Sequence, residues 1–345
     1  MFGVRAREST RVTHEALASL ARAAAESHFR ARMPYLGLDL GGTKLAAAVF
    51  ADDGELLHRE ATPLAGRTGG DVGALIAQRT EELARRFSCR ATGVCIPGLY
   101  RAARGTVWAP NIPGWDDYPL LDELRALFAG THAVAIDSDR AACILGETWR
   151  GAAQGACDAI FLAAGTGIGA GILAGGRVLR GTGDVAGAIG WLALDRPFHL
   201  RYLQHGCFED QGSGPGLVRV AHDLMETESS YDGVLRQFAE QLTAAEIFAA
   251  YEHNDPIADR VIENAIELWG MAAANLVSLF NPELVVFGGG VFGPAIKFLD
   301  RIRAEARRWA QPIAIEEVRF VGSALGSDAQ LYGAGRLAMS CEEER

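Results

Sequence analysis

The stretch from Leu36 to Phe50, LGLDLGGTKLAAAVF, places the strongest constraint on how this 345-residue chain can fold. Two runs of apolar, small and β-branched residues lie on either side of Gly41 and Gly42. This pattern predicts a β-hairpin whose two glycines supply the positive φ angles of a tight turn. An ordinary hairpin with a Gly-Gly turn is the alternative interpretation.

The same turn carries side chains suited to a phosphate group. Thr43 and Lys44 offer a hydroxyl and an amine, and glycine lets a ligand approach the backbone amides. Asp39 precedes the turn and is suited to face a metal ion. The spacing differs from a Walker A loop, in which the second glycine comes directly before Lys-Ser/Thr at the end of a longer motif.

Composition excludes several classes of function. A chain of 345 residues with 49% hydrophobic residues can bury a substantial core and favours two lobes. Its net charge of −10 argues against a partner nucleic acid or membrane surface. No window reaches the ~18 uninterrupted apolar residues of a membrane span. Six cysteines without a CxxC pair indicate reduced thiols and a cytoplasmic enzyme.

Residues 1–32 differ from the rest of the chain. They carry six arginines, three acids and an alanine-rich segment, which predicts an N-terminal extension that is helical or disordered. Charged residues interrupt its apolar stretch, so a signal peptide is not expected. The segment is also too short for a full winged helix-turn-helix.

Two more glycine-rich turns follow predicted strands. The strand from Asp158 to Leu162 leads to AAGTGIGAG, and the strand from Glu283 to Phe287 leads to GGGVFG. Two such turns that face each other across a cleft form a nucleotide site. The turn at 288–293 also matches G-x-G-x-x-G, the dinucleotide-binding pattern, so a dehydrogenase is an alternative. Too little chain follows this turn for a Rossmann half.

With these turns, DLGGTK at 39–44 resembles the ROK family of bacterial sugar kinases and repressors, part of the sugar-kinase/actin/Hsp70 superfamily. GVCIPG at 93–98 is similar to a turn at the family's cleft. The resemblance implies a two-lobed, ribonuclease-H-like α/β fold of the actin/hexokinase type with an interlobe cleft. The expected small lobe spans 33–138, with a C-terminal helix at 327–345 packing back on it, and the large lobe spans 139–326.

The resemblance further implies a site for ATP and Mg²⁺. Mg²⁺ would bridge the phosphates, with Asp39 nearby. The residues expected to hold the phosphates are Gly41, Gly42, Thr43, Lys44, Gly165, Thr166 and Gly167. The residues expected to lie against the adenosine are Gly288, Gly289 and Gly290.

A candidate catalytic base lies where a predicted strand, Ala133 to Asp137, meets a helix. Phosphoryl transfer to a hydroxyl needs a carboxylate to accept the proton. The resemblance assigns this role to Asp139, with Ser138 in place of the family's asparagine. Asp137 is the weaker candidate. The alternative for Asp139 is a helix N-cap.

The sugar side of the site departs from the family. The resemblance places Asn111, Ser138, Asp139 and Glu209 against the sugar. The family's second sugar-binding glutamate corresponds to Ala188. Its zinc-binding histidine corresponds to Trp191.

The family's zinc-binding cysteines are also largely missing. Two of them correspond to Leu200 and Tyr202, and only Cys207 remains. A structural zinc needs four ligands, so we predict that this zinc site is absent. A different metal site from His199, His205 and Cys207 is an alternative.

The predicted function is ATP-dependent phosphorylation of a hexose or sugar derivative by a glucokinase-like enzyme. The alternative is a catalytically silent sugar- or nucleotide-binding regulator of the same fold. The resemblance implies a homodimer or a higher homo-oligomer. The sequence does not identify the sugar or the hydroxyl that is phosphorylated.

Overall fold

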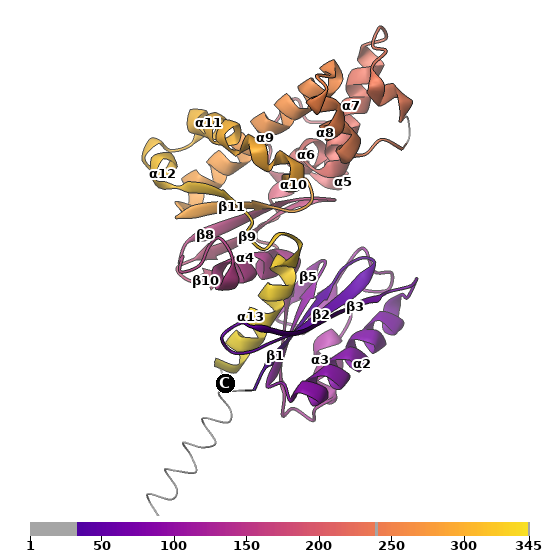
Figure 1. Ribbon diagram of the computed structural model, residues 1–345, viewed down its shortest axis with the longest axis vertical. Coiled ribbons are helices and arrows are strands. Elements are labelled where there is room, and N and C mark those ends of the chain that lie inside the picture. Colours follow the sequence, from indigo (N-terminus) through magenta and orange to yellow (C-terminus); the bar gives the residue numbers. More distant parts are fainter. Residues whose placement is uncertain (1–32, 239–240, 344–345) are drawn as a thin grey trace, which may run out of the picture.

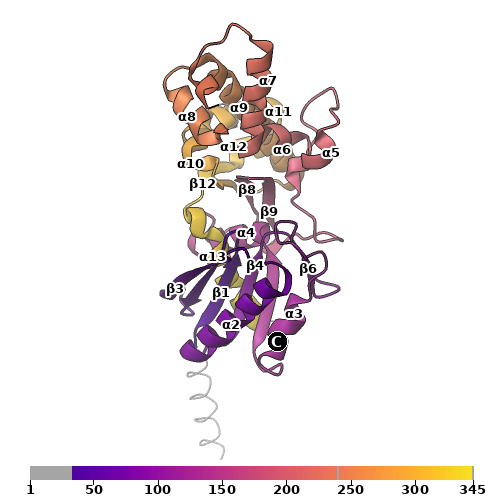
Figure 2. The same ribbon diagram turned by 90° about the vertical axis from the view of Figure 1, so that its right-hand side faces the viewer.

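Two five-stranded mixed sheets form the two lobes of the computed structural model, which describes residues 33–238 and 241–343 (Figure 1). The predicted extension at 1–32 lies outside these described residues. Helices α4 (Asp139–Arg150) and α13 (Ala329–Glu343) lie between the sheets (Figure 2). Within the described ranges, no helix has the length and apolar character needed to cross a membrane.

The sheet of the small lobe has the order β3-β2-β1-β4-β7. Its strands are β1 (Tyr35–Leu40), β2 (Lys44–Phe50), β3 (Leu56–Pro63), β4 (Ala91–Ile96) and β7 (Ala133–Ser138). Alternate side chains of a strand point to opposite faces. The odd-numbered residues of β2 therefore pack toward α2 (Gly69–Phe87) and α3 (Leu120–Ala126), and the even-numbered ones pack toward α13.

The sheet of the large lobe has the order β10-β9-β8-β11-β12. Its strands are β8 (Ala159–Ala164), β9 (Ile168–Ala174), β10 (Arg177–Val178), β11 (Leu284–Gly288) and β12 (Arg319–Gly322). One face packs on α9 (Pro256–Phe280) and the other on α4. The other helices of this lobe are α5 (Tyr202–His205), α6 (Cys207–Gly212), α7 (Gly214–Thr227), α8 (Ala244–Glu252), α10 (Phe292–Ala295), α11 (Leu299–Trp309) and α12 (Pro312–Glu317).

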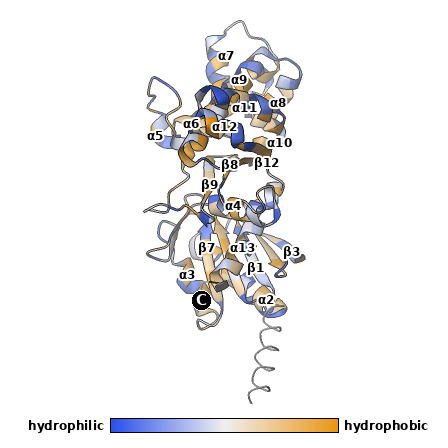
Figure 3. Cartoon of the chain, turned by 90° about the vertical axis from the view of Figure 1, so that its left-hand side faces the viewer, coloured by the Kyte–Doolittle hydropathy of each residue, from blue (hydrophilic) through white to orange (hydrophobic). Residues whose placement is uncertain are grey.

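Helix α9 shows how local sequence sets an element's bounds. Asp255 caps it by accepting hydrogen bonds from Ile257 N and Ala258 N, and Pro256 occupies the first turn, where a missing N–H costs nothing. Asn281 ends the helix in the left-handed region. The helices that cover the sheets carry both hydrophilic and hydrophobic residues, as expected for elements packed on one face (Figure 3).

Small residues let α4 and α13 cross in close contact. A Cβ atom on Gly333 of α13 would overlap the carbonyl oxygen of Ala142, and one on Gly146 of α4 would overlap that of Ala329. The two helices that join the lobes are thus packed backbone against backbone.

The predicted hairpin is confirmed, because β1 pairs antiparallel with β2 from Tyr35–Phe50 to Leu40–Leu45. The predicted positive φ angles are wrong: neither Gly41 nor Gly42 adopts one. Four residues connect the paired leucines, and Gly41 N donates to Lys44 O at 2.9 Å, so this longer loop closes without a left-handed residue. A Cβ on Gly42 would meet nothing within 4 Å.

Candidate active site

A cavity of about 1540 Å³ lies between the two lobes. Small-molecule sites are typically ~300–1,000 Å³, so this cavity has room for two ligands side by side. The predicted site residues that line it are Asp39, Gly41, Lys44, Asn111, Asp139, Gly165, Thr166, Gly167, Glu209, Gly288, Gly289 and Gly290. The predicted residues that do not line it are Gly42, Thr43 and Ser138.

Two carboxylates reach the cavity from the small-lobe sheet. Strands β1, β4 and β7 are parallel, so their carboxyl ends meet at one edge, which brings Asp39 and Asp139 together. Burial raises the pKa of Asp39 to about 6; a hydrogen bond with Cys95 and the charge of Lys44 oppose this rise, and the charge of Asp139 adds to it. Burial also raises the pKa of Asp139, and the charge of Arg140 opposes that shift.

Ser138, not Asp139, caps helix α4. The Ser138 hydroxyl accepts a hydrogen bond from Ala141 N at 3.3 Å. The alternative reading of Asp139 as the N-cap is therefore wrong. Its carboxylate accepts from the next backbone N–H, that of Arg140, at 2.8 Å and from its own backbone N–H, and it lines the cavity.

The second and third glycine-rich turns lie against each other at the large-lobe side. Gly165 N donates to Gly167 O at 2.9 Å and closes the turn between β8 and β9. Gly289 adopts a φ of +87°, and a Cβ there would overlap the carbonyl oxygen of Ala164. Only glycine therefore fits at 289. The two turns form one continuous backbone wall of the cavity.

The acceptor side of the cavity is lined by Asn111, Ala188, Trp191 and Glu209. Glu209 accepts a hydrogen bond from Ile168 N at 2.7 Å, which fixes its carboxylate beside the second glycine-rich turn. Trp191 is 56% exposed and therefore does not belong to the core. Its ring is available to a ligand in the cavity.

Comparison with known proteins identifies the family. The sequence profile described as the ROK family matches residues 35–340. The chain belongs to the ROK family. A glucokinase of Halalkalibacterium halodurans is 31% identical over 328 residues, which cover 89% of this chain and 96% of that protein. An N-acetyl-D-glucosamine kinase of Shigella boydii is 30% identical, over 83% of this chain and 94% of that protein.

A solved ROK structure agrees with the architecture. The crystal structure of a ROK family glucokinase from Streptomyces griseus in complex with glucose and AMPPNP has a TM-score of 0.71 and 30% identity. The match covers 89% of this chain and 99% of that chain. The predicted two-lobed α/β fold of the actin/hexokinase type is confirmed.

Two ion pairs that the sequence does not predict fasten the segment after Trp191, at Arg201, to helices α6 and α7. Asp210 is fully buried, with one carboxylate oxygen 2.7 Å from Arg201 Nε and the other 3.0 Å from Arg219 Nε. Gln211 donates to Tyr202 Oη at 3.1 Å. The only signal in the sequence is an aspartate directly after Glu209, since its partners are known only once the helices are packed.

Among residues 33–238 and 241–343, no group of three or more histidine, cysteine or acidic side chains is placed to hold a metal ion. The alternative metal site from His199, His205 and Cys207 is therefore not formed. The absence of the family's structural zinc stays a prediction, to be measured as metal content of the purified protein.

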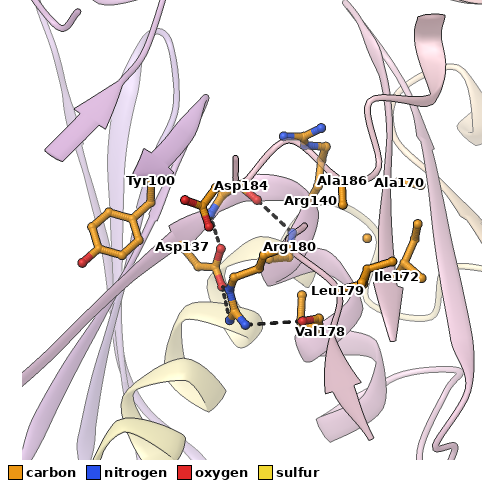
Figure 4. A pocket seen from close by; sticks show the side chains of 13 residues that line it. Tyr100, Asp137, Arg140, Ala170, Ile172, Val178, Leu179, Arg180, Asp184 and Ala186 are labelled. Carbon is orange, nitrogen blue, oxygen red and sulfur yellow. Dashed lines mark hydrogen bonds and ion pairs between the residues drawn. The ribbon is translucent and has the colours of Figure 1, made fainter. Parts of the chain in front are cut away.

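An ion pair that lines a second, smaller pocket joins the two ROK lobes (Figure 4). Asp137 at the end of β7 is 4% exposed, and its Oδ2 accepts from Arg180 Nε at 3.0 Å and from Arg180 Nη2 at 2.5 Å. Ala102 N of the small lobe also donates to Asp184 Oδ2 of the large lobe at 3.2 Å. Asp137 is thus a structural residue of the lobe junction.

Arg180→Ala is expected to lower the unfolding free energy by about 2 kcal/mol at pH 8, because it leaves the buried Asp137 carboxylate unpaired. This value is smaller than for a fully buried pair, because Arg180 is partly exposed to water. Burial raises the pKa of Asp137, and Arg180 opposes that rise. Loss of Arg180 therefore raises this pKa further. The carboxyl becomes neutral as the pH falls, so the loss should shrink toward pH 4.5. Urea unfolding at both pH values measures it, and an equal loss at both would contradict this account.

Proposed function

We propose that this protein is an ATP-dependent, glucokinase-like sugar kinase that transfers the γ-phosphoryl group of ATP to a hydroxyl of a hexose or sugar derivative. The observation that carries the proposal is the position of Asp139. Its carboxylate faces a cavity with glycine-rich turns on one side and Asn111 and Glu209 on the other. The kinase names of the two relatives support the same reaction.

Asp139 is the proposed general base. As the sugar oxygen bonds to the γ-phosphorus, its proton passes to the Asp139 carboxylate and the bond from that phosphorus to ADP breaks. Burial raises the pKa of Asp139, and a carboxylate with a raised pKa is a better proton acceptor than an ordinary aspartate. Asn111 and Glu209 orient the sugar hydroxyls. Ser138 does not line the cavity; it positions the base by capping helix α4, which begins with Asp139.

The nucleotide is proposed to lie along the glycine-rich wall. Lys44 and the backbone amides of Gly41 and of Gly165 to Gly167 would contact the phosphates, with the Thr166 hydroxyl. The adenosine would lie along Gly288 to Gly290. Gly42 and Thr43 belong to the same loop but contribute less, because they do not line the cavity.

Asp39 fits a Mg²⁺ ion. Burial raises the pKa of its carboxyl and the nearby charge of Asp139 adds to the rise, so a cation here would be favoured, and hard cations prefer such oxygen ligands. When bound there, Mg²⁺ would neutralise charge on the ATP phosphates. The two lobes, 33–138 with the 327–345 helix and 139–326, are proposed to close over both substrates and exclude water.

The proposed location is the cytoplasm, and the proposed assembly is a homodimer or higher homo-oligomer. All six cysteines are free, which supports a reducing compartment. Leu279, Trp309 and Ile313 are each at least 60% exposed, and such apolar residues favour an interface. Light scattering during size-exclusion chromatography measures the number of chains in the assembly.

A coupled assay of ADP release over hexoses, amino sugars and polyols tests the function. The kinase predicts that at least one sugar stimulates ADP release. If none does while one raises the melting temperature, the regulator alternative is favoured instead. An increase in NADH fluorescence on binding would favour the dehydrogenase.

The pH dependence of turnover should report the two coupled carboxyls. Catalysis needs Asp139 ionised and is favoured by an ionised Asp39, whose pKa is raised to about 6. We therefore expect kcat/KM to fall as the pH drops through about 6, the pKa of Asp39. Initial rates between pH 5 and 8 measure this, and a flat profile down to pH 5 would contradict it.

A further inference from the structure

Arg140 places a cationic side chain in the interlobe cavity with no partner of its own. It follows Asp139 directly and lines the cavity. Within the described part of the chain, its guanidinium makes no hydrogen bond or ion pair. Figure 4 shows it pointing away from the Asp137–Arg180 ion pair.

The stem of Arg140 runs beside the segment that leads to Ala188. A Cβ on Gly169 of β9 would lie 2.5 Å from Arg140 Cδ, so this glycine makes room for the arginine. Gly187 O accepts from Ala170 N at 2.8 Å, which fastens the residue before Ala188 to the same strand. Arg140 and Ala188 therefore share one part of the acceptor side.

The acceptors around this part of the cavity do not pair with the guanidinium in the described part of the chain. Ala188 offers no acceptor beyond its backbone. Glu209 is occupied by Ile168 N at 2.7 Å. Arg219, the other arginine of the cavity, already pairs with the buried Asp210 at 3.0 Å. Asp139, the proposed base, is the acid on which the charge of Arg140 acts, and Asp137, which lines the smaller pocket beside Arg140, is already paired with Arg180.

A guanidinium in such a place suits an anionic ligand. Its planar fork of N–H donors matches a carboxylate or a phosphate group, and the charge-assisted bonds are about twice as strong as neutral ones. A neutral hexose would leave this fork without an acceptor, and unpaired groups in a site are what discriminates against a substrate.

We propose that Arg140 determines specificity, and that the sugar accepted here carries an acidic group, a carboxylate or a phosphate, which Arg140 binds. This inference rests on the proposed kinase function. It places the acidic group beside Ala188, with the reacting hydroxyl at Asp139.

Turnover of matched sugars tests the proposal. D-glucose, D-mannose and D-galactose serve as neutral substrates, their hexuronates as carboxylate substrates and their 6-phosphates as phosphate substrates. We expect kcat/KM for one acidic series to exceed that for the neutral series by about tenfold or more. An equal or higher value for the neutral sugars would overturn the inference.

Two variants test the role of Arg140 independently. Arg140→Ala should reduce the ratio of acidic to neutral kcat/KM by about tenfold. Ala188→Glu should reduce the same ratio, because the new carboxylate pairs with Arg140. Arg177→Ala, on exposed β10 outside the cavity, is the control and should keep the ratio.

The contradicting outcomes are distinct. An unchanged ratio in both variants overturns the inference. An equal loss for both substrate classes in Arg140→Ala assigns this residue to the transferred phosphoryl group and also overturns it. ADP release with neutral sugars alone contradicts only the role of Arg140, whereas no release with any sugar contradicts the kinase function itself.

Discussion

Asp139→Asn is expected to lower kcat for sugar phosphorylation by about 10³ and to leave ATP binding nearly unchanged. Asparagine has the shape of aspartate but cannot accept the hydroxyl proton. The fold should tolerate the change, because Ser138 caps α4 and the Asp139 carboxylate accepts from adjacent backbone N–H groups, its own and that of Arg140, which an asparagine amide oxygen can also do. Coupled ADP release measures kcat, and calorimetry with AMPPNP measures nucleotide binding.

The matched control is Asp52→Asn, an exposed aspartate in the turn after β2, which should change kcat by less than about twofold. Turnover of Asp139→Asn equal to that of the natural protein would remove the proposed mechanism. Loss of AMPPNP binding would instead show that Asp139 acts on the nucleotide.

Gly333→Val is expected to cost about 3 kcal/mol or more of unfolding free energy. A Cβ at this position would overlap the backbone carbonyl of Ala142, and backbone cannot move aside as a flexible side chain can. Helices α4 and α13 would have to separate. Because α4 begins with Asp139, activity should fall together with stability. Urea unfolding followed by tryptophan fluorescence measures the change.

Gly70→Ala is the matched control for the glycine argument. Gly70 lies in the first turn of α2, and a Cβ there would meet nothing within 4 Å. Its unfolding free energy should not fall, because the added methyl group meets no atom and alanine is a better helix former than glycine. Equal stability of Gly333→Val and the natural protein would show that the helix crossing is looser than the backbone contacts indicate.

Local sequence predicts the parts of the site that depend on local structure. Strand patterns and glycine-rich turns place the hairpin at Asp39, the turn at Gly165 and the turn at Gly289 in advance. The strand-to-helix junction likewise places Asp139 at a helix start. These positions could be predicted because each depends on a few neighbouring residues, whose spacing shows where the strand ends and the turn begins.

Contacts between distant segments were not predictable in the same way. Asp137 pairs with Arg180 across 43 positions, and no local pattern connects them. The exposure of Trp191 likewise depends on how its loop packs. The φ angles at Gly41 depend on the length of the loop between paired strands, which the glycine pair alone does not determine.

Transfer of label from [γ-³²P]ATP to sugar tests the central claim most directly. The protein is incubated with labelled ATP and the sugar that most stimulates ADP release, and the products are separated by chromatography. We expect the label in a sugar phosphate, formed by the natural protein and lost with Asp139→Asn. Label found only in inorganic phosphate, or a sugar phosphate formed equally by both proteins, would contradict the account.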